Sequence, residues 1–445
     1  MKGLLILMTH GLFISAFSQS MLRLSVDDCI SYGLGNNEQL AITDYDKQIA
    51  NLEVRETIAE GLPQATINGG LNYNYEIQKS LLDVSNFSDA PPGTEEEVAF
   101  GQDYDGNLVL EVNQLIFDGS YFVGLQAART YRDLSSKDHI ETQIDVVEAV
   151  SKAYYFALIS VERLELVKAN LARIDTLLSE TIKMYEAGFA EKLEVDRIKV
   201  TYNNLKVDLS ESTQLKELSE KLLKFQMGMD LNQNIELTEN LDEVDVSMPL
   251  IPSSNFNYAD RIEFSQLITG EQLKELDMKN NRSQYLPTLN ANFSYGYNTA
   301  TSDFDQLFTT SRWLNYGVIG LSASIPVFDG FMKRSRIQQN KLELKQLESE
   351  KSFLRKSIDI EIEESRITLT SQIETLEVQK QNVELARYIY DIAKVKYQQG
   401  VGSNLEVTDA DTAFKEAQIN YLDSVYEAKT SQIELKKALG ILYTN

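Results

Sequence analysis

Four short landmarks occur twice in this 445-residue chain, in the same order. The first copy has Leu62-Pro63, Ile116-Phe117-Asp118-Gly119, Tyr185-Glu186-Ala187-Gly188 and Phe225-Gln226-Met227-Gly228, and the second has Leu286-Pro287, Val327-Phe328-Asp329-Gly330, Tyr397-Gln398-Gln399-Gly400 and Lys437-Ala438-Leu439-Gly440. In each copy the third landmark is followed by Leu-Glu-Val, at 193–195 and at 405–407. A chain with this pattern is predicted to fold as two copies of one structural unit.

The spacing of the landmarks supports the duplication. From the aspartate of the second landmark to the glycine of the third, the interval is 70 positions in the first copy and 71 in the second. From that glycine to the glycine of the fourth landmark, the interval is 40 positions in both copies. The interval from the proline to the aspartate is 55 positions in the first copy and 42 in the second, which indicates a longer loop in the first copy.

Each copy begins with two segments in which apolar and polar residues alternate, as in a strand with one apolar face. The sequence predicts strands at about 65–78, 105–117, 288–299 and 314–327. Lengths of about ten residues suit tilted strands that span a bilayer. The alternative is a soluble hairpin with one face on a core. Aromatic residues typical of a membrane interface favour the first interpretation: Tyr73, Tyr75, Tyr295, Tyr297, Trp313 and Tyr316.

The rest of each copy is predicted to be helical, at about 25–60, 120–187 and 190–228 in the first copy and about 258–284, 331–399 and 403–440 in the second. The stretch from Met332 to Gln399 contains neither Pro nor Gly, and its apolar residues step by 3, 4 or 7 positions along one stripe. Helices of this length have no globular core to cover them. We therefore expect them to pack on each other as a coiled coil.

Composition excludes several classes of function. A formal net charge of -25 argues against nucleic-acid binding, because phosphates are bound by clustered Lys and Arg. The chain has two histidines, His10 and His139, and one cysteine, Cys29, which cannot form a His-based catalytic triad or a His-rich metal site. A carboxylate pair of the glycosidase kind stays open, although most carboxylates on acidic helices are solvated. We expect no enzyme activity, no metal and no cofactor.

The first 18 residues are predicted to be a secretory signal. Lys2 precedes a mostly apolar stretch, and Ala16-Phe17-Ser18 resembles a small-x-small cleavage site. No later run of 18 or more apolar residues predicts a transmembrane helix, which leaves an exported soluble protein or a β-barrel. Four strands are too few to close a barrel, and an open sheet would leave unpaired backbone groups in hydrocarbon. Three protomers would supply 12 strands, within the range of known barrels.

The sequence resembles the TolC-type outer-membrane efflux proteins over nearly the whole mature chain. The resemblance depends on the tandem repeat, on Phe-Asp-Gly at each strand-to-helix junction, and on a glycine followed by Leu-Glu-Val at each helical turn. It assigns 19–229 and 258–445 to two efflux repeats, joined by a connector at 230–257 in an equatorial belt. The fold it implies is mainly α with a membrane β-barrel part: a trimeric 12-stranded barrel continued by a periplasmic α-helical coiled-coil barrel.

The resemblance also implies a function and partners. The homotrimer would be a passive exit duct from the periplasm to the outside, set in outer-membrane lipid and docked to a periplasmic adaptor and an inner-membrane transporter. It would serve a tripartite efflux or type I secretion system, and drug, metal and protein substrates all stay open. The main alternative is an exported coiled-coil structural or adhesin protein without a channel. A secreted carboxylate-based hydrolase is a second alternative.

Five residues are candidates for a gate at the periplasmic tip. Glu406 and Asp409 lie on one face of the opening turns of the last helix and match family positions that project into the lumen. The alternative is that they only favour the helix dipole. Tyr397 matches an aromatic residue of the family gate, and Glu194 and Arg197 lie at the equivalent offsets in the first copy.

The two helical turns are the candidate adaptor-docking tips. They are formed at Gly188 and Phe189 in the first copy, and at Gly400, Val401 and Gly402 in the second. Some family members have a basic residue where this chain has Gly402, so the sequence departs from the family pattern at that position. The alternative is that the turns only connect helices.

Overall fold

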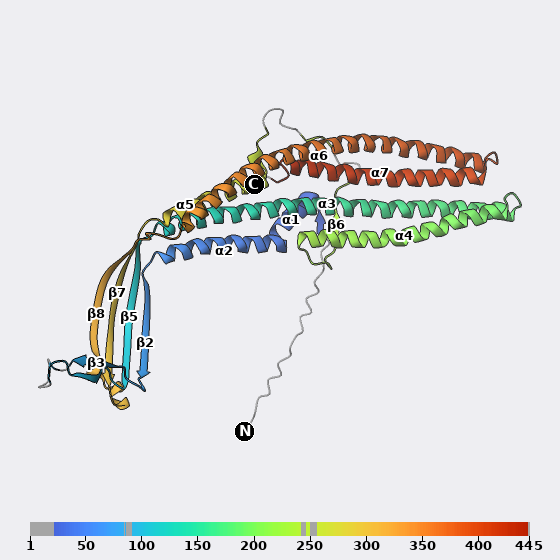
Figure 1. Cartoon of the computed structure of the whole chain (residues 1–445). Coiled ribbons are helices and arrows are strands. Elements are labelled where there is room, and N and C mark those ends of the chain that lie inside the picture. Colours follow the sequence, from blue (N-terminus) through green and yellow to red (C-terminus); the bar gives the residue numbers. More distant parts are fainter. Residues whose placement is uncertain (1–21, 84, 86–90, 242–245, 250–255, 444–445) are drawn as a thin grey trace, which may run out of the picture. The chain divides into compact units, whose positions relative to one another are not determined.

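The computed structural model describes residues 22–83, 85, 91–241, 246–249 and 256–443, so the signal expected at 1–18 lies outside the described residues. The chain is mainly helical and divides into two compact units (Figure 1). Unit 1 comprises Met1–Tyr45, Lys137–Ser265 and Ser352–Asn445, and unit 2 comprises Asp46–Ser136 and Gln266–Lys351.

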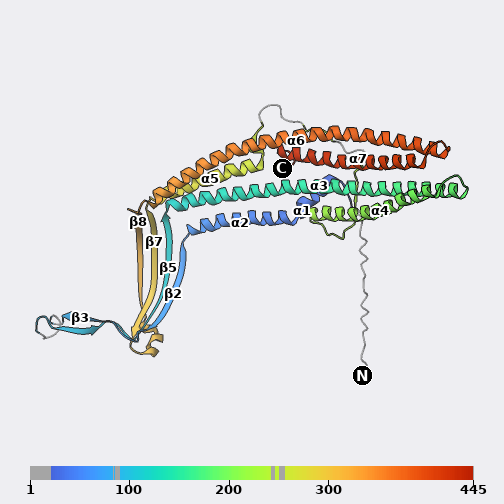
Figure 2. The same cartoon turned by 45° about the vertical axis from the view of Figure 1, so that its right-hand side comes forward.

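Unit 2 contains a four-stranded sheet in the order β2-β5-β7-β8 (Figure 2). Its strands are β2 (Gln64–Tyr73), β5 (Tyr104–Phe117), β7 (Thr288–Thr301) and β8 (Leu314–Ser324). Each neighbouring pair is antiparallel. The two outer strands, β2 and β8, therefore run antiparallel to each other, and among the described residues nothing pairs with their outer edges.

The register gives this sheet one apolar and one polar face. Val112 lies opposite Phe293, which in turn lies opposite Ile319, and Ile319 is 83% exposed. On the other face the side chain of Asn72 donates a hydrogen bond of 2.7 Å to the carboxylate of Asp105. The register thus places the apolar side chains of all four strands on the same face of the sheet and their polar side chains on the other.

Two of the strands end earlier than the sequence pattern predicts. The strand expected at 65–78 ends at Tyr73, and the backbone of Asn74 makes one further hydrogen bond in the same register, to the carbonyl of Asp103 (2.7 Å). The strand expected at 314–327 ends at Ser324, two residues before Pro326, which has no N–H to donate to a ladder. Alternating side chains continue beyond the hydrogen-bonded strands in both cases.

The longer loop of the first copy contains a second, separate hairpin. Strands β3 (Lys79–Asp83) and β4 (Glu95–Ala99) pair antiparallel, and Lys79 forms an exposed ion pair with Glu97 (3.3 Å). In the second copy the corresponding connection holds two short 3₁₀ helices, η4 (Phe304–Phe308) and η5 (Thr310–Arg312).

The two longest helices begin at the Phe-Asp-Gly landmarks. They are α3 (Gly119–Glu186) and α6 (Met332–Gln398), and each starts where an aspartate accepts a backbone hydrogen bond. Ser120 donates to Asp118 (2.6 Å), and Lys333 donates to Asp329 (3.1 Å). A carboxylate here satisfies a free N–H and is favoured by the helix dipole. The landmark therefore marks the change from strand to helix.

Shorter helices accompany the long ones in unit 2. The end of α2 (Glu38–Glu60) belongs to this unit, as does most of α5 (Ile262–Ser283). Lys279 of α5 donates to the side chain of Gln126 on α3 (2.9 Å), and Lys351 of α6 pairs with Glu271 on α5 (2.7 Å).

Unit 1 contains two long helical hairpins, formed by α3 with α4 (Lys192–Met227) and by α6 with α7 (Asn404–Ala438) (Figures 1 and 2). It also contains α1 (Val26–Asn36) and a parallel pair of short strands, β1 (Leu22–Leu24) and β6 (Ile235–Leu237). The connector expected at 230–257 thus contributes one strand, β6.

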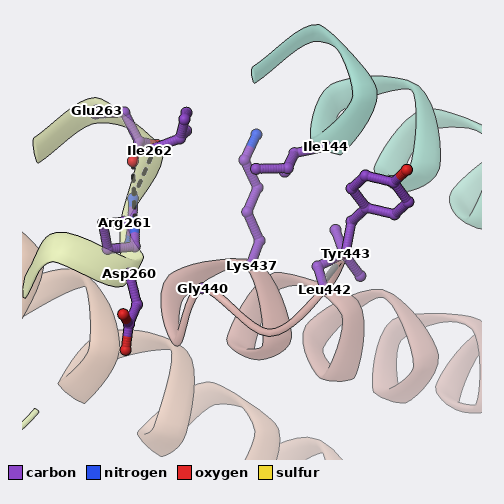
Figure 3. A pocket seen from close by; sticks show the side chains of 9 residues that line it. All are labelled: Ile144, Asp260, Arg261, Ile262, Glu263, Lys437, Gly440, Leu442 and Tyr443. Carbon is purple, nitrogen blue, oxygen red and sulfur yellow. Dashed lines mark hydrogen bonds and ion pairs between the residues drawn. The ribbon is translucent and has the colours of Figure 1, made fainter. Parts of the chain in front are cut away.

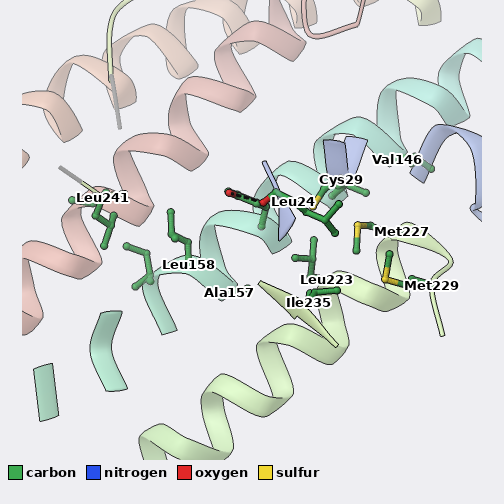
Figure 4. Close-up of a cluster of buried hydrophobic side chains, with 14 of the residues drawn as sticks. Leu24, Cys29, Val146, Ala157, Leu158, Leu223, Met227, Met229, Ile235 and Leu241 are labelled. Atoms are coloured by element: carbon green, nitrogen blue, oxygen red, sulfur yellow. Dashed lines mark hydrogen bonds between the residues drawn. The ribbon is translucent and has the colours of Figure 1, made fainter. Parts of the chain in front are cut away.

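One apolar cluster in unit 1 joins the short N-terminal elements to the hairpins (Figure 4). Cys29 is fully buried there, against Leu223 and Met227 near the end of α4. Tyr154 of α3 is also fully buried, and its hydroxyl donates to the carbonyl of Leu24 (3.4 Å). Cys29 is therefore a small apolar core residue.

The helix expected at 25–60 is two helices, separated at Asn37. The side chain of Asn37 accepts from the backbone of Gln39 (2.8 Å), which starts α2, and donates to the carbonyl of Gln226 (2.8 Å). Gly228 ends α4 in the left-handed conformation (φ 67°), and a Cβ there would lie under 3.0 Å from the backbone of Asn36. The close approach of two chain segments explains both the break and the glycine.

A charged junction forms where 3₁₀ helix η3 (Tyr258–Asp260) meets the end of α7 (Figure 3). Arg261 is buried; it donates to the carbonyl of Ala438 (2.8 Å) and pairs with Glu263 (3.1 Å). The guanidinium thereby satisfies a carbonyl at a helix C-terminus, where positive charge is favoured.

Lys437 lines the same small pocket and connects α7 to α3. Its ammonium pairs with Asp145 (2.8 Å) and with Glu148 (2.7 Å), and Lys152 also pairs with Glu148 (2.8 Å). Burial opposes ionisation of Glu148, but the two lysines outweigh it and lower the pKa of this carboxyl. Because the pKa of this carboxyl is lower in the folded chain than in the unfolded chain, its ion pairs stabilise the fold at any pH above the unfolded-state pKa. This stabilisation is lost as the pH falls through the folded-state pKa.

The left-handed glycines allow a matched test of close packing. Gly228→Ala and Gly188→Ala both place a side chain at positive φ, which costs about 1–2 kcal/mol. Only at Gly228 would the new Cβ meet backbone atoms, since nothing lies within 4 Å of the position at Gly188. We expect Gly228→Ala to lower the thermal unfolding midpoint, followed by helical circular dichroism, clearly more than Gly188→Ala. Equal shifts would contradict the packing argument.

Candidate functional site

The two hairpin turns end in the same hydrogen-bonded motif. Gly188 (φ 81°) donates to the carbonyl of Tyr185 (3.0 Å), and Gly400 (φ 75°) donates to that of Tyr397 (3.0 Å). The residues that follow, Phe189 and Val401, each donate five positions back, at 2.8 Å and 3.1 Å. This is the Schellman arrangement, which ends a helix through a left-handed glycine. It leaves two apolar side chains exposed at the tips, Phe189 at 82% and Val401 at 78%.

Gly402 has no room for a side chain. Its backbone donates to the carbonyl of Lys396 (3.2 Å), and a Cβ would lie 2.9 Å from the Cβ of Lys396 and 3.1 Å from the backbone nitrogen of Tyr397. The turn is folded back onto the end of α6. A side chain at this position would therefore require the turn to shift.

Two of the five gate candidates meet inside unit 1. Tyr397 is buried, and its hydroxyl donates to the carboxylate of Glu194 on α4 (3.4 Å) and lies 3.3 Å from the hydroxyl of Thr181 on α3. Next to it the side chain of Gln398 donates to Glu180 (3.3 Å). These contacts join the α6–α7 hairpin to the α3–α4 hairpin close to the turns.

Glu406 and Asp409 lie together at the start of α7, away from that contact. Ser403 caps the helix by accepting from the backbone of Glu406 (3.2 Å). Both carboxylates are exposed and line an open groove of about 550 Å³ between α6 and α7, into which Lys396 also projects. The structure therefore brings these two candidates together on one face, as their spacing predicts.

Arg197, the fifth candidate, lies on the exposed side of α4. Among the described residues its guanidinium has no ion-pair partner. Within a single chain it meets neither Tyr397 nor the carboxylates of the groove.

A buried ion pair that the sequence analysis did not single out joins the two hairpins. Arg173 of α3 donates to the carboxylate of Asp411 on α7 (2.7 Å), and the two side chains are 18% and 3% exposed. The guanidinium lies over the neighbouring rings of Tyr390 (4.9 Å) and Phe414 (5.0 Å). Burial raises the pKa of Asp411, while Arg173 opposes the shift. Such cation–π contacts compensate part of the cost of burying the charge.

A signal for this pair exists in the sequence. Asp411 lies four positions after Val407 and three before Phe414, which are both buried, so a charged residue occupies a core position of the helical stripe. A buried charge in such a position needs a partner of opposite sign, and Arg173 occupies the matching core stripe of α3 next to Ile174 and Leu177.

The described part of the chain offers little for other chemistry. It contains no group of three or more His, Cys, Asp or Glu residues placed to hold a metal ion. None of its helices combines the length and apolar character needed to cross a membrane.

Comparison with known proteins shows which proteins the chain is similar to. A family model described as "Outer membrane efflux protein" matches residues 272–441. Outer membrane protein TolC of Salmonella enteritidis is 21% identical over 440 residues, covering 97% of this chain and 85% of that protein. Toluene efflux pump outer membrane protein TtgC of Pseudomonas putida is 24% identical over 325 residues, covering 71% of this chain and 64% of that protein. The Campylobacter jejuni CmeC outer membrane channel superposes with a TM-score of 0.73 at 16% identity, covering 94% and 86% of the two chains.

Long helical hairpins and a small antiparallel sheet form the fold that this chain shares with the CmeC outer membrane channel. The chain is therefore similar to the TolC family of outer-membrane efflux proteins, which supports a location in the cell outer membrane, extending into the periplasm.

The buried ion pair can be tested with a double-mutant cycle. Asp411→Leu leaves the Arg173 guanidinium buried without its partner, which typically costs about 3–5 kcal/mol. Adding Arg173→Met removes the second charge, and we expect the double variant to recover most of the lost stability, measured as the thermal unfolding midpoint. If the destabilisation of the double variant equals the sum of those measured for Asp411→Leu and Arg173→Met alone, the pair does not act as a unit.

Proposed function

We propose that this chain is one protomer of a homotrimeric exit duct, built from two repeats at 19–229 and 258–445 with the connector at 230–257 in an equatorial belt. The duct gives passive passage from the periplasm to the outside in a tripartite efflux or type I secretion system. Its partners are a periplasmic adaptor, which docks on the two hairpin tips, and an inner-membrane transporter. The efflux proteins to which the chain is similar support this assignment.

The observation that carries the proposal is the sheet with an exposed apolar face and two unpaired edges. In hydrocarbon every backbone N–H and C=O has to be paired, so an open sheet needs further strands. Because β2 and β8 run antiparallel, the β8 edge of one copy can pair with the β2 edge of the next in the same antiparallel pattern. Three copies then give a closed barrel of 12 strands, an even number as in bacterial barrels.

Helix α2 supports assembly independently of the sheet. Its apolar residues Ile42, Tyr45, Ile49 and Leu52 step by 3, 4 and 3 positions and are each more than half exposed. This is the spacing of a coiled-coil seam, and an exposed seam requires another helix to cover it. The neighbouring protomer supplies one in a ring of long helices.

Glu406 and Asp409 are the proposed selectivity residues of the tip. Threefold symmetry places six such carboxylates around the periplasmic entrance, where they attract cations and repel anions. Their exposure and their shared groove support this role.

Purified protein in detergent tests the duct. We expect a native mass of three chains and, after insertion into planar bilayers, stable single-channel conductance. A chain that is released by washing membranes, or a trimer that does not conduct, would support the coiled-coil structural or adhesin protein instead.

The selectivity residues can be tested with a matched pair of variants. Glu406→Ala with Asp409→Ala removes two carboxylates three positions apart, and we expect weaker cation selectivity and weaker block by divalent cations in single-channel recordings. Glu53→Ala with Glu56→Ala on α2 makes the same change in charge at the same spacing, on exposed residues far from the turns in the sequence. We expect the control to conduct like the unaltered protein. Unchanged selectivity in the first variant would exclude the proposed role.

A further inference from the structure

The connection between β7 and β8 folds into a small element at one end of the sheet in unit 2. This element, the β7–β8 cap, comprises residues 303–313 and contains η4 and η5. It lies at the end of the strands remote from the start of α3 and α6 (Figure 2). The indole nitrogen of Trp313 donates to the carbonyl of Leu307 (2.8 Å), and the side chain of Leu307 is 2% exposed. The cap is therefore a folded element with a buried residue of its own.

The β7–β8 cap lies on the apolar face of the sheet. Gly106 belongs to that face, because it is six positions before Val112 on β5 and side chains alternate along a strand. A Cβ at Gly106 would lie 2.9 Å from Cη2 of Trp313, so the indole ring extends over this face as far as β5. The ring of Phe304 contacts that of Tyr104 edge to face (5.6 Å), and Tyr104 is two positions before Gly106 on the same face.

The cap replaces polar surface by apolar surface. Beyond Tyr297 the next positions of β7 on this face are Thr299 and Thr301, which are 6% and 1% exposed beneath the cap. In their place the cap presents Phe304 and Phe308, which are 54% and 66% exposed and whose rings are 5.5 Å apart. The distance from Tyr297 to Thr301 is about 14 Å along a strand, or about 10 Å along the membrane normal at the usual tilt of barrel strands. The cap thus lengthens the apolar face where the strand itself becomes polar.

The exposed rings of the cap continue an aromatic surface of the sheet. Tyr73 of β2 is 62% exposed, and its ring stacks on that of Tyr104 (4.9 Å), which in turn contacts Phe304. A continuous exposed apolar surface of this kind indicates a partner that covers it. Because it continues the face that suits lipid, and because aromatic side chains are favoured at the boundary of hydrocarbon and headgroups, the chemistry points to lipid.

We propose that the β7–β8 cap is a lipid-binding element, in which Phe304 and Phe308 contact the acyl chains of the outer leaflet of the membrane. The inference rests on the proposed duct, in which the apolar face meets lipid and the strand ends remote from the helices face the outside. It adds a lipid contact that β7 alone does not provide. The occupant is an acyl chain, because the exposed part of the cap offers two phenyl rings side by side.

Spin labels measure this contact directly. Phe308→Cys is made in a Cys29→Ala background, labelled with a nitroxide, and reconstituted into phosphatidylcholine bilayers. The accessibility of the label to oxygen, which concentrates in lipid, is compared with its accessibility to a water-soluble nickel chelate. Ile319→Cys is the reference on the apolar face, and Asn107→Cys is the matched control, exposed on the polar face. We expect the ratio of oxygen to nickel accessibility at Phe308 to be close to that at Ile319 and several-fold above that at Asn107.

The other outcomes separate failure of the inference from failure of the duct. A conducting trimer whose label at Phe308 resembles that at Asn107 has its cap in water, which contradicts the lipid contact and leaves the duct standing. A label at Phe308 that neither reagent reaches is covered by protein, which contradicts the lipid contact as well. A label at Ile319 that is reached by nickel and not by oxygen contradicts the proposed function itself, as does the absence of a trimeric native mass.

The unaltered protein offers a second measurement, because Trp313 is the only tryptophan of the chain. Phosphatidylcholine brominated on its acyl chains is expected to quench the Trp313 fluorescence strongly, and iodide in the buffer is expected to quench it little. Strong quenching by iodide with none by bromine would rule out the lipid contact.

A matched pair of variants tests the two rings themselves. Phe304→Ser with Phe308→Ser removes the exposed rings of the cap, and we expect bromine to quench Trp313 less and iodide to quench it more. Phe328→Ser with Phe331→Ser makes the same change in another exposed pair, whose rings are 5.4 Å apart at the other end of the sheet. We expect this control to be quenched like the unaltered protein. A cap variant that also behaves like the unaltered protein would contradict the contact of the rings with acyl chains.

Discussion

The unpaired outer edges of β2 and β8 impose the constraint on which the rest of the molecule depends. The sheet has an apolar face that suits lipid, but its edges expose backbone groups that lipid cannot satisfy. A soluble protein would cover such edges with a helix, a charge or a bulge. Among the described residues of this chain nothing covers the two edges, which run antiparallel to each other. The apolar seam on α2 is likewise exposed. In the proposed duct, the single protomer is one segment of a larger closed wall.

The helical part combines apolar seams with a few buried polar contacts. Apolar packing alone does not fix the axial position (the height) of one helical hairpin along another, because successive turns of a coiled coil are nearly equivalent. The pair formed by Arg173 and Asp411 does fix that height, since a shift by one turn would leave both charges buried and alone. The contact of Tyr397 with Glu194 acts in the same way closer to the turns.

Periodicity and spacing predicted much of this structure. The long helices and the positions of the glycines follow from the absence of Gly and Pro and from the repeated intervals, which are local properties of the chain. Features that depend on contacts distant in sequence were not predictable. The break at Asn37 exists because the end of α4 passes close by, and the partner of Asp411 lies 238 positions away. The strand ends near Tyr73 and Ser324 were overestimated because side chains continue to alternate after the backbone leaves the ladder.

The direction of the two edge strands has a further consequence for how many copies can assemble. Any number of protomers joined edge to edge in this way keeps every strand antiparallel to its neighbours and gives an even number of strands. Strand pairing alone therefore does not limit the assembly to three copies. The number must be set by the angle at which one hairpin meets the next. In the proposed duct, a substitution on a helical seam would therefore change the diameter of the pore without altering a single strand hydrogen bond.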